Sequence, residues 1–280
     1  SLSSETDGVR STAVGHSALA TQNLAGGYQA YHVAVGYNAG TAITTGLQNT
    51  LIGSLAGDVL SDADYNVAVG YGSLSADTQG SLSTAIGKSA LANQNFTTAT
   101  NTFNVAVGAG AGEQVTTGQE NTLIGGLAGD ALTAANYNVT VGYATLSADT
   151  LGSRSVAIGF EALTTQNFTT ATNAYNVAIG FQAGHDITTG QQNTIIGGLA
   201  GDKLTDADYN VVMGLNSLGS DTQGSRSTAL GYNTLNAQNF GTAANTNNVA
   251  VGYNAGMSVT TGTSNTIIGS NTGDAITDAD

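Results

Sequence analysis

The chain has 280 residues, and only 9% of them are charged, with a formal net charge of −14. Hydrophobic residues make up 40% of the chain, which is enough to bury a core and too much for an acidic disordered protein. Lys and Arg are few and scattered, cysteine is absent and every apolar run is too short for a membrane helix. We therefore expect no nucleic-acid binding, no disulfide and no membrane insertion.

Short β-branched segments follow one another along the chain, beginning with residues 12–14, 33–35 and 50–52. Outward and inward residue types alternate with period two in each segment, which is typical of a strand and not of a helix. Each segment ends in an aliphatic residue followed by a glycine. These glycines are Gly15, Gly36, Gly53, Gly70, Gly87, Gly108, Gly125, Gly142, Gly159, Gly180, Gly197, Gly214, Gly231, Gly252 and Gly269.

The glycines are spaced by 21, 17, 17 and 17 residues, and this pattern recurs, so four units form a super-repeat of 72 residues. One such unit cannot bury its own apolar side, but units stacked in register can. The sequence therefore predicts an all-β fold, a parallel β-solenoid (β-roll or β-helix) of about 15 coils, one unit to a coil. Successive coils would be about 4.8 Å apart.

Stacking in register would place like residues in columns along the solenoid. Val35, Ile52 and Val69 would lie above one another. Asn residues four before the glycine, such as Asn49 and Asn66, would form a ladder of side-chain amides. The glycines would allow tight corners or a close approach of two backbones, and the small residues three positions later would let the layers pack closely.

One unit in each super-repeat is four residues longer than the others. The additional residues fall in the related segments 94–101 and 166–173, whereas the first copy, from Gln22, has a different sequence. Insertions in solenoids become loops on one face, so we expect a protrusion every fourth coil. Neither end has the atypical polar cap that a solenoid needs, so we expect residues 1–280 to be one repetitive segment of a longer fibre.

Acidic residues gather in two copies of one connection. Neighbouring carboxylates can hold Ca²⁺, which takes six to eight oxygen ligands. Aspartate also favours turns through its own hydrogen bonds, and the related turn around Asp130 has lost the other acids. Ca²⁺ binding and a turn-forming role are therefore two alternatives for Asp58, Asp62, Asp64, Asp202, Asp206 and Asp208.

Aromatic residues often come directly after the repeat glycine. Their flat faces are suited to a carbohydrate or receptor surface, and the alternative is a column that packs between chains or against a loop. The tyrosines at this position are Tyr37, Tyr71, Tyr143, Tyr232 and Tyr253.

A second acidic column carries no predicted chemistry. It consists of Asp77, Asp149 and Asp221, which we expect to form turns or to place charge at an edge against side-on aggregation.

The periodic pattern argues against an enzyme. His16, His32 and His185 fall in different registers and do not pair at metal-ligand spacing. A catalytic site needs singular residues, whereas a periodic array offers the same environment many times. We therefore expect no catalytic site and no cofactor apart from the Ca²⁺ considered above.

Several units resemble known fibre repeats. Residues 83–91 (STAIGKSAL) are similar to the S-x-A-I-G repeats in the head of trimeric autotransporter adhesins. Residues 66–74 (NVAVGYGSL) and the T-T-G of 44–46 resemble more closely the repeats of phage tail fibres, and this resemblance covers essentially the whole chain. It implies a β-roll or β-helix, left-handed in the adhesin heads, with three chains side by side and a role in attachment.

We therefore predict a structural and adhesive fibre segment, extracellular, on a virion tail or a cell surface. Its expected partners are copies of itself, as a homotrimer or an end-to-end filament, and a host receptor or glycan. One alternative is an ice- or crystal-surface binder, although Val33 and Val67 interrupt the row of Thr12, Thr50 and Thr84. Another is a secreted polysaccharide-cleaving enzyme, which would need a cluster of acids or bases outside the repeat pattern.

Overall fold

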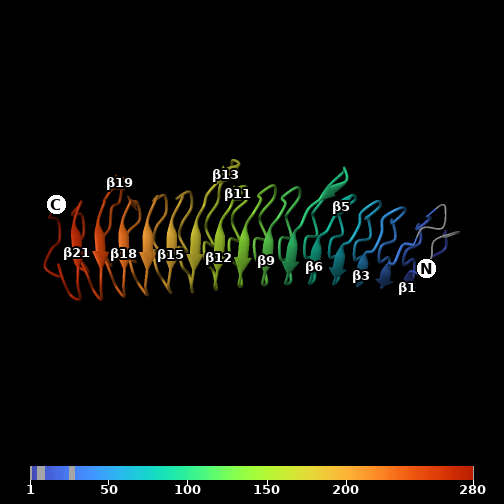
Figure 1. Cartoon of the computed structure of the whole chain (residues 1–280), viewed down its shortest axis with the longest axis horizontal. Coiled ribbons are helices and arrows are strands. Elements are labelled where there is room, and N and C mark those ends of the chain that lie inside the picture. The colour runs from blue at the N-terminus through green and yellow to red at the C-terminus, as the bar shows by residue number, and fades with distance from the viewer. Residues whose placement is uncertain (1, 5–9, 25–28, 280) are drawn as a thin grey trace. The chain divides into compact units, whose positions relative to one another are not determined.

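Three-residue strands, one in each repeat unit, carry the fold. The computed structural model describes residues 2–4, 10–24 and 29–279, and no helix occurs among them. The chain divides into two compact units, Ser1–Asn138 and Val139–Asp280. In Figure 1 the strands of each unit lie side by side, with one connecting loop between each strand and the next. The predicted fold class is confirmed: the protein is an all-β, parallel β-solenoid of about 15 coils.

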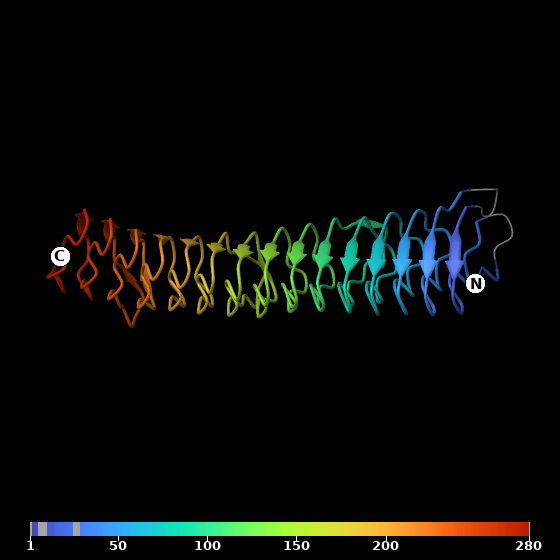
Figure 2. The same cartoon turned by 90° about the horizontal axis from the view of Figure 1, so that it is seen from below.

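In the first unit the strand order is the chain order. Its strands are β1 (Thr12–Val14), β2 (Val33–Val35), β3 (Thr50–Ile52), β4 (Val67–Val69), β6 (Thr84–Ile86), β8 (Val105–Val107) and β9 (Thr122–Ile124). The second unit contains β10 (Val139–Val141), β12 (Val156–Ile158), β14 (Val177–Ile179), β15 (Thr194–Ile196), β16 (Val211–Met213), β18 (Thr228–Leu230), β20 (Val249–Val251) and β21 (Thr266–Ile268). Figure 2 shows the same succession after a quarter turn.

The register is set by the repeat. Val35 pairs with Ile52 and Ile52 pairs with Val69, so the predicted column of outward aliphatic residues is confirmed. Backbone hydrogen bonds close each step: the N–H of Gly70 donates to the carbonyl of Ile52 at 2.8 Å. A parallel ladder of this kind satisfies the backbone of one coil with that of its neighbours.

The core lies inside the coils and is filled by large and small residues that complement one another in size. The middle residue of each strand points inward, and Leu51 has no exposed surface. A Cβ atom on Gly40 would come within 2.6 Å of the Leu51 Cδ1, and one on Gly57 within 2.9 Å of its Cδ2. Two glycines therefore make room for one leucine. The predicted small column is also buried, as Ala39 and Ala56 show with no exposed surface.

The asparagine ladder forms, but with other partners than predicted. Asn49 is fully buried; its Nδ2 donates to the carbonyl of Ala63 at 2.7 Å, and its Oδ1 accepts from the Asn66 N–H at 2.9 Å. A direct amide contact, such as that of the Asn121 Nδ2 with the Asn104 Oδ1 at 3.3 Å, is longer. The prediction of amide-to-amide bonds was therefore only partly right. Each buried amide mainly satisfies backbone groups of the next coil.

Glycine is required at the corner after each strand. Gly70 has φ of 137°, and a Cβ atom there would lie 2.4 Å from the carbonyl oxygen of Gly87 in the next coil. Side chains are also found at left-handed positions, as at Tyr65 (φ 59°) and Leu74 (φ 52°). Such conformations are unfavourable for bulky residues, and the stacked hydrogen bonds of the coils hold them in place.

The predicted insertions form small additional sheets. In the first unit β7 (Thr100–Asn101) pairs with β5 (Gly80–Ser81). In the second, β13 (Thr172–Asn173) pairs with β11 (Gly152–Ser153), and β19 (Ala244–Asn245) with β17 (Gly224–Ser225). The loops near β5 and β13 extend beyond their neighbours in Figure 1. The first insertion includes residues 25–28, which lie outside the described residues.

Candidate binding surface

The outward side of the strands is unusually apolar. Residues one and three before the repeat glycine point away from the core, and Ile52 and Val211 are both more than a third exposed. All large exposed hydrophobic side chains of the described residues lie between five positions before and two positions after a repeat glycine. We call this side of each unit the strand face. An extended apolar surface is a common mark of an interaction site.

One edge of the strand face carries the aromatic residues predicted from the sequence. Tyr37, Tyr71, Tyr143, Tyr232 and Tyr253 are between 42% and 56% exposed. We call the position directly after the glycine the post-glycine column. Stacked rings occur along it, with centroids 5.2 Å apart for Tyr232 and Tyr253, and Phe160 lies 5.5 Å from Phe181. These rings therefore pack on one another along the solenoid and keep their outer surfaces exposed.

A second aromatic column, not predicted from the sequence, lies five positions before the glycine. In the first unit it contains Tyr31, Tyr65, Phe103 and Tyr137, and in the second Tyr175 and Tyr209. We call it the pre-strand column. The signal in the sequence was the dipeptide of an aromatic residue and asparagine before alternate strands, as in Tyr65-Asn66.

All three arginines of the chain also occupy the pre-strand column. The guanidinium of Arg10 lies 5.7 Å from the ring centroid of Tyr31, and its Nη1 donates to the Tyr31 hydroxyl at 2.9 Å. Arg226 lies 5.7 Å from the ring centroid of Tyr209. Cation–π contacts of this geometry stabilise the position of the ring.

The acidic turns use their oxygen atoms within the fold. The Asp62 Oδ1 accepts from the Thr45 hydroxyl at 2.6 Å, and the Asp64 Oδ1 accepts from the Leu47 N–H at 2.7 Å. Asp206 and Asp208 repeat both contacts, with Thr189 and Gln191 as donors. These four acids thus connect neighbouring coils, which is a structural role but not the local turn bond expected from the sequence. Among the described residues no three His, Asp or Glu side chains are arranged to hold a metal ion.

Asp58 and Asp202, the remaining acids considered for Ca²⁺, lie one position after a core glycine. Burial raises the pKa of Asp58, and its Oδ1 has no hydrogen-bond partner within the described residues. Burial likewise raises the pKa of Asp202, against the opposing effect of Lys203. Within the described residues the structure does not bring either acid into a group of three, and Ca²⁺ binding stays one of the two alternatives.

The other acidic column differs from the prediction of an edge charge. Asp77, Asp149 and Asp221 have no exposed surface. The Asp77 carboxylate accepts from the N–H groups of Gly80 and Phe96 at 3.0 and 2.9 Å. Each carboxylate also accepts from a buried glutamine of the following coil. These acids therefore anchor the insertion loop from inside. The bond from the Gly80 N–H, three residues on, fits the expected turn-forming role, whereas the edge-charge interpretation was wrong because it did not foresee the loop that covers these acids.

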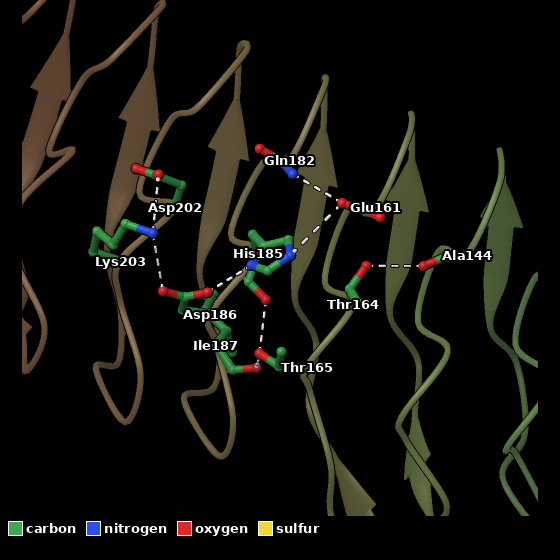
Figure 3. Close-up of polar contacts among 10 residues, drawn as sticks. All are labelled: Ala144, Glu161, Thr164, Thr165, Gln182, His185, Asp186, Ile187, Asp202 and Lys203. Carbon is green, nitrogen blue, oxygen red and sulfur yellow. Dashed lines mark hydrogen bonds and ion pairs between the residues drawn. The ribbon is translucent and has the colours of Figure 1, made fainter.

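One charged cluster interrupts the periodicity of the second unit. Figure 3 shows His185 between Glu161 and Asp186, with Lys203 beyond Asp186. The His185 Nδ1 is 2.5 Å from the Asp186 Oδ1 and its Nε2 is 3.8 Å from the Glu161 Oε2. The Lys203 Nζ is 3.2 Å from the Asp186 Oδ2. Burial alone would raise the pKa of Asp186, but hydrogen bonds from His185 and Lys203 outweigh it and lower the pKa.

The cluster lacks an activated nucleophile among the residues it contacts. The nearby Thr165 hydroxyl donates to the backbone carbonyls of His185 and Ile187, at 2.7 and 3.0 Å, and not to the imidazole (Figure 3). A nucleophile would need to give its proton to the base. The cluster therefore joins three neighbouring coils through charge and hydrogen bonds.

Shallow hollows also lie on the two units, the first of them at the post-glycine edge of the strand face. One, of about 190 Å³, is lined by Lys88, Ser89, Ala109, Gly110, Glu113 and Leu127. The other, of about 320 Å³, is lined by Asp206, Asp208, Ser225, Ala243, Ala244 and Asn245. Both are open, so the extended strand face offers the larger surface for recognition.

The chain matches no family model, no curated protein and no solved structure. Within its described part there is also no helix of the length and apolar character needed to cross a bilayer. What is established is the class of protein, a parallel β-solenoid with an apolar, aromatic-edged strand face.

Proposed function

We propose that the protein is a structural and adhesive fibre segment that attaches to a surface through its strand face. The observation that carries this proposal is the concentration of all large exposed hydrophobic side chains of the described residues on that one side of each unit. In an isolated monomer these apolar side chains would stay exposed to water, which is unfavourable. Contact with another molecule would bury them and stabilise the complex.

The periodic construction supports a structural role. Each coil contacts only its neighbours, so a solenoid can be lengthened coil by coil without a new core. We further propose that the chain works extracellularly, on a virion tail or a cell surface, in a longer fibre of three chains or in an end-to-end filament. The host partner would be a receptor or a glycan. The similarity to fibre repeats described above supports these finer points.

The proposal is tested by imaging and by mass. Purified protein examined by negative-stain electron microscopy should appear as rods, and sedimentation should give the number of chains in each particle. The rods should adhere to host cells or to isolated cell envelopes. They should also compete with the longer fibre that contains this segment for binding to the same surface. Compact globules, or rods that adhere to no surface, would contradict the proposal.

An ice- or crystal-surface binder is the second candidate. It is favoured by the outward threonines of the strand face, such as Thr50 and Thr84, on a regular β lattice. Val139, Val156 and Val177 occupy this position in three successive coils and leave no hydroxyl row there. An ice-recrystallisation assay separates the two candidates, since a fibre segment should leave crystal growth unchanged.

We propose no catalytic activity. The buried acids are engaged in hydrogen bonds that recur in each super-repeat, and the His185 cluster directs its nearest hydroxyl away from the imidazole. A loss of viscosity when the protein is mixed with polysaccharides would overturn this proposal and favour the enzyme alternative.

A further inference from the structure

The rings of the pre-strand column in the first unit recur at a fixed interval. Tyr31, Tyr65, Phe103 and Tyr137 occupy the same position in alternate coils and are between 44% and 52% exposed. Two coils correspond to a separation of about 9.5 Å along the axis. The column thus presents aromatic side chains of similar exposure at a regular spacing.

The backbone fixes the direction of the Cα–Cβ bond at these residues. All four residues have left-handed φ angles, between 51° and 61°. The N–H of Tyr65 donates to the Leu47 carbonyl of the preceding coil at 3.0 Å, and that of Tyr137 to the Gln119 carbonyl at 3.1 Å. A surface built on such a rigid scaffold loses little conformational entropy when it binds a ligand.

Polar side chains alternate with the rings in this column. Gln48 lies in the coil between Tyr31 and Tyr65, and Glu120 lies in the coil between Phe103 and Tyr137; both are exposed. Leu82 fills the remaining intermediate coil. The column therefore places a hydrogen-bonding side chain between two rings in two of its three intermediate coils.

We propose that the pre-strand column of the first unit binds an extended, neutral, β-linked polysaccharide laid along the solenoid axis. This inference rests on the proposed attachment function and names its ligand class. A sugar ring has an apolar C–H face that stacks on aromatic rings and a rim of hydroxyls that bond to amides and carboxylates. In an extended β-linked chain alternate sugars present the same face, and each sugar advances the chain by about one coil. Alternate rings would then meet equivalent sugar faces.

The charge distribution selects a neutral ligand. The chain has a net charge of −14, and Asp64 immediately precedes one of the rings. An acidic polysaccharide would be repelled by this field, while an uncharged one would not. The binding should consequently depend little on salt concentration, because no counterions are released.

The test measures binding of the whole chain to defined glycans. The probes are soluble cellohexaose and chitohexaose, with insoluble cellulose and chitin in pull-down assays, and polygalacturonate as the anionic comparison. Binding of at least one neutral β-linked probe, and none of polygalacturonate, is expected. Because the chain has no tryptophan, tyrosine fluorescence should report occupancy directly.

Substitution of the rings tests the site itself. Asparagine occupies the pre-strand column naturally at Asn247 with φ of 52°, so Tyr65→Asn and Phe103→Asn should preserve the fold. The double variant should bind the neutral probe about tenfold or more weakly, since each stacked ring contributes a separate increment. The matched control is Tyr71→Ser, which removes an equally exposed ring from the post-glycine column and should leave affinity unchanged.

A position exchange tests the spacing. The double variant Gln48→Tyr/Tyr65→Gln keeps the number of rings and the composition but breaks the two-coil interval. It should bind several-fold more weakly than the wild type if the interval matches the ligand. Wild-type affinity in this variant, or in Tyr65→Asn/Phe103→Asn with an unchanged thermal unfolding midpoint, would overturn the proposal.

Two other outcomes also decide the question. If the ring substitutions change the oligomeric mass and no glycan binds, the column is an interface between copies of this chain and the inference is wrong. If no neutral probe binds while the rods still adhere to host surfaces, the inference fails and the proposed function stands. Absence of both rods and adhesion would instead remove the proposed function.

Discussion

The Nε2 group of Gln94 donates a 2.5 Å hydrogen bond to the Oδ2 of Asp77, and both side chains are completely buried. The opposite end of the same amide accepts from the Asn104 Nδ2 at 2.9 Å. Gln94 therefore connects the carboxylate beneath the insertion loop to the asparagine ladder. An unpaired buried carboxylate is costly, so this bond should matter for stability.

Replacement of Asp77 by asparagine should destabilise the protein. In Asp77→Asn the new amide N–H would face either the Nε2 of Gln94 or the N–H groups of Gly80 and Phe96, and rotating Gln94 would break its bond with Asn104. We expect a loss of about 1–3 kcal/mol in the free energy of unfolding, measured by chemical denaturation. The added change Gln94→Glu restores an acceptor and should recover part of the loss. Asp62→Asn, on an exposed turn, serves as control, and an equal effect in both would contradict the role assigned to Asp77.

Substitution of a corner glycine should be more damaging than that of a loop glycine. In Gly70→Ala the new Cβ would come within 2.4 Å of the Gly87 carbonyl oxygen, at a φ of 137°. The two coils would have to separate, at a cost of roughly 2–4 kcal/mol. Gly241→Ala is the control, because a Cβ there meets no atom within 4 Å. Equal thermal unfolding midpoints for the two variants would show that the corners tolerate side chains.

Removal of one buried hydroxyl should stabilise the second unit. The Thr140 Oγ1 is buried and has no hydrogen-bond partner among the described residues, and Val212 fills the corresponding site in β16. Thr140→Val should therefore raise the free energy of unfolding by about 1 kcal/mol. By contrast, Thr145→Val removes a hydroxyl that donates to the Gly142 carbonyl, and it should not stabilise. A midpoint lowered by Thr140→Val would argue for a partner that this structure does not contain.

The pH dependence of the charged cluster follows from the lowered pKa of Asp186. A carboxyl group whose pKa is lower in the folded than in the unfolded state stabilises the fold above the unfolded value. That contribution disappears as the pH falls through the folded pKa. The wild type should therefore be more stable than Asp186→Asn at pH 7, by about 1 kcal/mol or less in the free energy of unfolding, because the pair is partly exposed. The difference should be lost as the pH falls through the folded pKa of Asp186, which lies below the usual value of an aspartate.

Lys203→Gln provides the control for this titration. It removes one of the two donors that lower the pKa of Asp186. The difference in free energy of unfolding between Lys203→Gln and Asp186→Asn should therefore be smaller than that between the wild type and Asp186→Asn, at every pH above the folded pKa of Asp186. If the difference in free energy of unfolding between the wild type and Asp186→Asn grew on acidification, its sign would be wrong. That result would refute the stabilising role assigned to the ionised Asp186.

Calcium provides a separate test of the acidic turns. Asp62 and Asp64 each already accept a hydrogen bond from the preceding coil, and so do Asp206 and Asp208. We expect millimolar Ca²⁺ or excess EDTA to leave the thermal unfolding midpoint unchanged. A rise with Ca²⁺ that Asp62→Asn abolishes would favour the ligand interpretation of these acids.

The periodic features could be read from the sequence because each depends on stacking alone. Val35 pairs with Ile52 as predicted, and Gly70 occupies a corner where a neighbouring backbone approaches closely. The asparagine ladder was foreseen at Asn49, but its partners were not, because they are backbone carbonyls fourteen residues away.

The features that were missed depend on non-local or unusual geometry. In the sequence Asp77 looks like any acidic turn residue, and its burial is caused by Gln94 and Phe96 of the following coil. Tyr65 and Leu74 adopt left-handed angles that local propensity disfavours, so a sequence pattern of period two gives no sign of them. The pre-strand column went unnoticed for the same reason.

The super-repeat spans four coils, an even number, whereas the pre-strand rings recur in every second coil from Tyr31 to Tyr209. Duplication or loss of a whole 72-residue block therefore preserves their alternation, but gain or loss of one 17-residue unit would put two halves of the column out of phase. Recombination that copies whole blocks can therefore lengthen the gene and keep the rings in phase. Copying a single 17-residue unit does not, so duplication of four coils at a time would be favoured.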